Sequence, residues 1–139
     1  MSDALELTLS VRLAEGLPDG ELAELRWHLG LGEQPEHLVL VTAFPEVEED
    51  DDGGLIAENR PRPLLDSTGD LAALPGDGWT LTAHRTVHPA EFEPLGRLLV
   101  ALAERTGITG PVVIGQLRSP DSTLAEPLLV RGGTVRWPA

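Results

Sequence analysis

Apolar and polar residues alternate strictly along Leu5–Leu13, with an apolar residue at every odd position and a polar residue at every even one. A period of two over nine residues predicts a strand that is buried on one face only. The same alternation returns over residues 79–87, where Arg85 interrupts it. We therefore expect two half-buried strands that lie far apart in the sequence.

A helical pattern follows the first of these strands. Leucines three and four residues apart predict a helix that begins at Pro18 or Asp19 and ends at Gly30 or Gly32. A second strand is expected at Leu38–Phe44, because this run is apolar on both faces except at Thr42. The first half of the chain thus has the order strand, helix, strand.

The second half repeats this order. A leucine stripe predicts a helix that begins at Glu93 or Pro94 and ends at Gly107, since a proline deeper inside a helix would cost about 3 kcal/mol. The apolar run at residues 112–117 predicts the next strand. Two further apolar runs flank Gly132-Gly133, which is the turn signal of a C-terminal β-hairpin.

The region between the halves, residues 45–78, reads as a long acidic insertion rich in proline and glycine. A loop of this length is uncommon in a compact domain. We expect disorder near residues 48–54, and either mobility or short docked elements at 55–57 and 71–74.

Two interleaved βαβ units with right-handed crossovers predict an α+β fold with a ferredoxin-like split βαβ topology. In this arrangement both helices cover one face of an antiparallel sheet, to which the C-terminal hairpin is added. The alternative is an α+β sheet whose strand order the hairpin rearranges. The length of 139 residues predicts a single domain spanning 1–139.

The amino-acid composition excludes several kinds of covalent and catalytic chemistry. The chain contains no cysteine, lysine or tyrosine, which excludes disulfides, thiolate catalysis, Schiff-base chemistry and a phenolic acid or base. All ten basic residues are arginine, as expected from a GC-rich genome. We expect no cofactor and no metal site. His84, His88 and Glu91 are candidate metal ligands by type, but they span a strand end and a turn and need not converge.

The net charge of −13 disfavours nucleic-acid binding, which depends on clustered cations. No stretch approaches the roughly 20 apolar residues needed to span a membrane. The N-terminus has neither the basic nor the apolar part of a secretory signal, so we expect a cytoplasmic protein. An acidic surface can attract a basic protein partner.

In the predicted topology, the polar sides of the first and third strands lie together on the uncovered face of the sheet. This face holds hydroxyl groups, one cation and one histidine, and its candidate binding residues are Thr8, Ser10, Arg12, Thr80, Thr82, His84 and Thr86. Two interpretations stay open: a polar ligand or partner binds this face, or it is an ordinary solvated sheet face, where threonine is favoured.

The last predicted strand ends in Arg136 and Trp137, and an exposed tryptophan at this place could anchor a partner or a second copy of the chain. The hypothesis that fits these patterns is a non-catalytic binding or regulatory module that contacts another protein, as an acidic partner or inhibitor of a basic one. The alternative is a small-molecule-binding protein or minor enzyme that uses the polar sheet face. A homodimer through the hairpin edge is the third.

Overall fold

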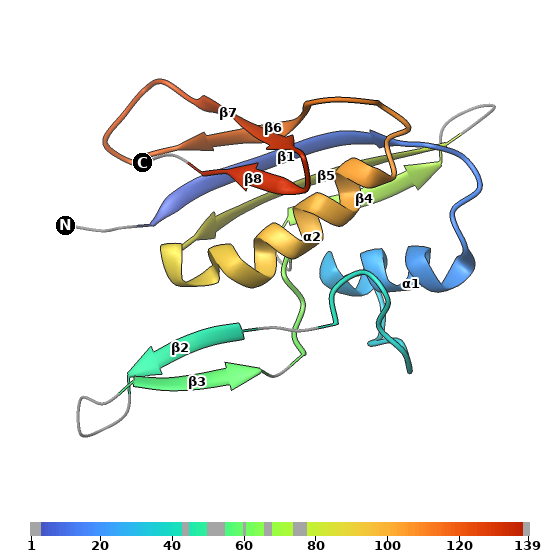
Figure 1. Cartoon of the computed structure of the whole chain (residues 1–139), viewed down its shortest axis with the longest axis horizontal. Coiled ribbons are helices and arrows are strands. Elements are labelled where there is room, and N and C mark those ends of the chain that lie inside the picture. Colours follow the sequence, from blue (N-terminus) through green and yellow to red (C-terminus); the bar gives the residue numbers. More distant parts are fainter. Residues whose placement is uncertain are drawn as a thin grey trace.

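The computed structural model describes residues 4–42, 45–49, 55–59, 61–65, 68–73 and 78–137. This part of the chain forms eight strands, two α-helices and one short 3-10 helix (Figure 1). In chain order these elements are β1 (Leu5–Leu13), α1 (Asp19–His28), β2 (Pro45–Glu49), β3 (Leu55–Asn59), β4 (Thr68–Ala73), β5 (Trp79–Val87), η1 (Pro89–Glu91), α2 (Phe92–Glu104), β6 (Val112–Arg118), β7 (Glu126–Arg131) and β8 (Thr134–Arg136).

Six of the strands form an open antiparallel sheet in the order β4-β5-β1-β6-β7-β8. The two strongly alternating segments, β1 and β5, are neighbours inside it, with Leu9 opposite Ala83. Both helices lie on the same side of the sheet (Figure 1). The alternation at odd positions of β1 is therefore matched by burial: Leu7, Leu9, Val11 and Leu13 are buried, whereas the polar residues between them are not.

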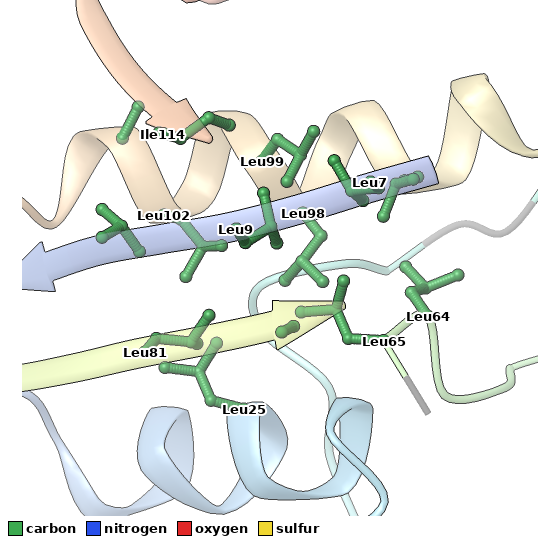
Figure 2. Packing of buried hydrophobic residues seen from close by; sticks show 14 of the residues in the cluster. Leu7, Leu9, Leu25, Leu64, Leu65, Leu81, Leu98, Leu99, Leu102 and Ile114 are labelled. Carbon is green, nitrogen blue, oxygen red and sulfur yellow. The ribbon is translucent and has the colours of Figure 1, made fainter. Parts of the chain in front are cut away.

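The core forms where α2 crosses the covered face of the sheet. Leu98, Leu99 and Leu102 of α2 are fully buried against leucines of β1 (Figure 2). Helix α1 adds Leu25, which lies near Leu81 of β5. The α+β class and the ends of β1 and β5 thus follow the sequence pattern closely.

The strand expected at Leu38–Phe44 is not formed in its described part, residues 38–42, and residues 43–44 lie outside the described chain. Its apolar composition resembles that of a buried strand, but its N–H groups bind a side chain of α1 in place of a neighbouring strand. The strand beside β5 is β4 instead, from within the 45–78 region. That region is therefore more than an insertion, since it supplies one edge of the main sheet.

The rest of the 45–78 region contains a separate two-stranded sheet, β2–β3. It lies apart from the main sheet, near η1 and the first turn of α2 (Figure 1). Of the segment expected to be disordered, residues 48–49 belong to β2, and residues 50–54 lie outside the described chain. The short element expected at 55–57 lies within β3, which pairs with β2 in the separate sheet. The one expected at 71–74 overlaps β4 up to Ala73, with Leu71 in the core, and residue 74 lies outside the described chain.

Two glycine positions shape the C-terminal half. Gly132 and Gly133 have φ angles of 60° and 76°, the left-handed pair that a tight two-residue hairpin turn requires. At Gly115, β6 approaches β1 so closely that an added Cβ would collide with the backbone oxygen of Thr8. The hairpin β7–β8 extends the sheet beyond β6, and the strands before it keep the order β4-β5-β1-β6.

Candidate binding groove

A groove of about 530 Å³ runs along the outer flank of α2, between this helix and β8. We call it the α2–β8 groove. Its far wall is the irregular segment that precedes β2. Its lining residues are Leu40, Val41, Thr42, Phe92, Glu93, Gly96, Arg97, Val100, Ala101, Glu104, Gly133, Thr134, Val135 and Trp137. Apolar side chains that are only half-buried gather here from three separate parts of the chain, and such surface is what a binding partner can cover.

An aromatic stack closes one end of the groove. The rings of Phe92 and Trp137 are parallel to within 1°, with centroids 4.0 Å apart. Phe92 starts α2 and Trp137 directly follows β8, so the stack joins the helix to the edge of the sheet. Gly96, one turn along the helix, leaves open space that a Cβ would fill at 3.7 Å from the Trp137 ring. The stack thus presents an aromatic surface to the groove.

The wall opposite β8 is held by a buried carboxylate. Glu24 of α1 is fully buried and accepts hydrogen bonds from three successive backbone N–H groups. Val39 N donates to Oε1 at 2.6 Å, Leu40 N to both oxygens at 3.0 and 3.1 Å, and Val41 N to Oε2 at 2.9 Å. A segment without helix or strand is thereby fixed against α1, because the carboxylate replaces a neighbouring strand as acceptor.

His28, one turn after Glu24, anchors a second irregular segment. Its Nδ1 accepts the backbone N–H of Leu64 at 3.3 Å, and its backbone oxygen accepts the N–H of Leu65 at 2.8 Å. With Nδ1 an acceptor, the ring proton is on Nε2, which lies 3.4 Å from Glu24 Oε2. The ring is fully buried and does not line the groove, so this carboxylate–imidazole pair has a structural role.

Burial raises the pKa of Glu24, but the hydrogen bonds from His28 and from the three wall N–H groups outweigh it. The net result is a pKa below the ordinary value of a glutamate. Glu24 is therefore ionised at neutral pH, and its charge is balanced by donors.

The groove continues past the middle of α2. A second hollow of about 140 Å³ shares Val100, Glu104 and Gly133 with it and ends at Ile108, whose side chain is 58 % exposed. The charged residues along the rim are Glu93, Arg97 and Glu104, and Arg97 is engaged by Glu93 at 3.0 Å. The two hollows are thus contiguous and open to solvent, and two glutamates and one arginine lie along their rim.

Several arginines are engaged by the chain's own carboxylates. Arg85 contacts Glu91 at 2.6 Å, and Arg118 pairs with Glu6 across β1 and β6. Because the chain has 23 acidic residues and only ten arginines, most carboxylates have no arginine to pair with. The excess is greatest at residues 45–59, which contain seven acidic residues and no basic one. Glu91 also accepts the backbone N–H of His88, and among the described residues no cluster of three or more metal-ligating side chains is found.

The polar residues predicted to share the open sheet face are brought together as expected. Across β1 and β5, Thr8 lies opposite His84, Ser10 opposite Thr82, Arg12 opposite Thr80, and Glu6 opposite Thr86. Thr80 is half-buried, and the other six candidates are exposed. None of the seven lines the α2–β8 groove, so a binding role for this face stays a prediction.

The two candidate interface residues, Arg136 and Trp137, differ in their surroundings. Trp137 is half-buried in its stack on Phe92, whereas Arg136 is exposed. Both line a hollow of about 320 Å³ on the far side of β8, together with Val113 and Leu129. Trp137 therefore lies between two hollows, at the edge of the sheet.

The sequence pattern did not reveal Phe92, Gly96 and Val100 as groove residues. A signal was present: Phe92, Gly96, Val100 and Glu104 are spaced by four, which places them on one flank of α2. A glycine inside a helix also costs about 1 kcal/mol relative to alanine. The wall at 40–42 had no such signal, because it depends on a contact between distant segments.

No protein-family model, curated protein or solved structure matches this chain. In the described part, no helix has the length and apolar character that crossing a membrane requires.

Proposed function

We propose that this protein is a non-catalytic binding module that holds an extended, basic segment of another protein in the α2–β8 groove. The observation that carries the proposal is the Phe92–Trp137 stack at the end of an open groove whose lining mixes apolar and polar residues. Aromatic side chains in half-buried positions are typical anchors of protein interfaces, because one face is available to a partner at little entropic cost.

Charge supports a basic partner. The chain carries a net charge of −13, and its most acidic stretch begins at Pro45, three residues after Thr42 of the groove wall. Strand β2 lies near the first turn of α2, where the aromatic stack is. A segment that combines an apolar anchor with arginine or lysine would therefore suit both the aromatic stack and the negative charge of the chain. Such complementarity increases association rates and disfavours acidic competitors.

The experiment is a selection of random twelve-residue peptides displayed on phage against the immobilised protein. We expect enrichment of peptides that combine an aromatic or aliphatic residue with several basic ones. Trp137→Ala should lower the affinity of a selected peptide by about 10-fold or more, the loss typical of a truncated anchor. Gly96→Ala should also weaken binding, although it favours the helix and its Cβ makes only ordinary contacts with Trp137.

The matched control is Thr82→Ala on the open sheet face, which should leave peptide affinity unchanged. The proposal fails if no peptide is enriched, or if the selected peptides bind Trp137→Ala as tightly as wild type. If Thr82→Ala or His84→Ala abolishes binding instead, the partner or ligand occupies the polar sheet face. Loss of a dimer in Trp137→Ala, observed by light scattering, would make the groove a contact between two copies of this chain.

We also propose that the centre of the sheet is a ferredoxin-like split βαβ arrangement in which β4 takes the place of the strand expected at 38–44. The order β4-β5-β1-β6 supports this, since both neighbours of β5 run antiparallel to it. Nuclear Overhauser contacts between the Cα protons of Gly69 and Ala83 would test the pairing. Their absence would remove β4 from the sheet.

A further inference from the structure

We infer that Glu24 is the positioning residue of the α2–β8 groove: its carboxylate, which touches no ligand-accessible surface, holds the 39–42 wall in place. The predicted effect of Glu24 on peptide binding rests on the proposed function, whereas its predicted effect on the position of the wall does not.

The geometry separates Glu24 from the surface that it organises. Its side chain is fully buried and is not part of the groove lining. Two of the three residues whose N–H groups it binds, Leu40 and Val41, do line the groove, and Thr42 follows them. Because residues 38–42 form neither helix nor strand, the Glu24 carboxylate supplies the acceptors that a neighbouring strand would give, beside the burial of Val41 in the core.

The arrangement needs a carboxylate and not merely a polar group of the same shape. Val39 N donates to Oε1, Val41 N donates to Oε2, and Leu40 N lies between them, within reach of both. A glutamine has one accepting oxygen and one NH₂ donor. Whichever way its amide is turned, the N–H of Val39 or Val41 would face another donor. The bond from Val39 is part-buried and the bond from Val41 is buried, so an N–H left without its acceptor is costly at either place and part of the wall should detach.

The test compares Glu24→Gln with Glu21→Gln by amide hydrogen exchange, in the absence of any ligand. Glu21 is on the same helix, but it pairs with Arg105 at 2.5 Å and not with the wall. We expect the amides of residues 39–41 to exchange about 10-fold faster or more in Glu24→Gln, relative to the amides of β1 and β5. Glu21→Gln should leave that ratio unchanged.

Exchange that rises equally everywhere would overturn the inference, because it would show a general loss of stability and no local wall. Unchanged exchange at residues 39–41 would overturn it as well. Should Glu24→Gln fail to fold, Val39→Pro tests the same contact from the other side. It removes one donor at a side chain that is 57 % exposed, and residues 40–41 should then exchange faster.

Binding is measured with the peptide selected on phage. Its affinity should fall by about 10-fold in Glu24→Gln and stay unchanged in Glu21→Gln. Faster local exchange without loss of affinity would show that the wall does not matter for binding, which contradicts the positioning role. If the wild type binds no peptide, the proposed function fails, while the exchange experiment still decides whether Glu24 holds the wall.

Discussion

The two α-helices bury different kinds of side chain. Helix α2 buries apolar side chains and one proline, with its charged residues on the outer flank. Helix α1 buries two ionisable residues, Glu24 and His28, beside Leu25 and Trp27. The difference follows from what each helix faces: α2 covers strands whose backbone is already paired, whereas α1 meets irregular segments whose N–H groups need acceptors.

The comparison teaches that the fold and the groove depend on different forces. Apolar packing under α2 builds the sheet-and-helix core, and burial of a leucine is insensitive to pH. The groove wall is fixed by hydrogen bonds to one carboxylate, which are directional and depend on ionisation. Changes to each helix should therefore produce losses of different size and different pH dependence.

The largest effect is expected in α2. Leu98 is fully buried in the centre of the core, so Leu98→Ala should lower the free energy of unfolding by about 2–5 kcal/mol through lost burial and an unfilled cavity. Urea denaturation followed by tryptophan fluorescence measures this loss. A loss below about 1 kcal/mol would show that α2 is not packed as described.

An intermediate effect is expected in α1, and it should depend on pH. At neutral pH, Glu24→Gln should lower the free energy of unfolding by about 1–3 kcal/mol, because either the part-buried N–H of Val39 or the buried N–H of Val41 loses its acceptor. The pKa of Glu24 is lowered on folding, so its stabilisation is fully present above the pKa of the unfolded chain. It is lost as the pH falls through the folded pKa.

The stability difference between wild type and Glu24→Gln should therefore shrink as the pH is lowered through the acid range. Urea denaturation of both proteins at a series of pH values measures this difference. A difference that is the same at every pH would contradict the ionised, hydrogen-bonded state of Glu24. Leu98→Ala serves as the comparison, since its loss has no ionisable origin.

This contrast also explains which features could be read from the sequence. Strands such as Leu5–Leu13 and the helix over residues 92–104 have a period that reflects one buried face, and both were predicted closely. The run 38–44 has the composition of a buried strand, but its partner is a glutamate fourteen residues before it, and local pattern carries no information about such a contact. For the same reason the groove could not be predicted, because its walls come from three separate parts of the chain.

The smallest effect is expected at Glu21, three residues before Glu24 on the same helix. Its carboxylate pairs with Arg105, and both side chains keep about one-fifth of their surface in water. Solvent screens such a pair, so Glu21→Gln should lower the free energy of unfolding by only about 0.2–1 kcal/mol, and less at high salt. Urea denaturation at low and at high salt measures both. A loss as large as that of Glu24→Gln would show that the Glu21–Arg105 ion pair stabilises α1 as much as the hydrogen bonds of Glu24 do. A small, salt-sensitive loss would show instead that the two carboxylates of α1 differ in their contribution to stability. Glu24 then contributes more because it binds backbone N–H groups away from water, whereas Glu21 pairs with an arginine that solvent screens.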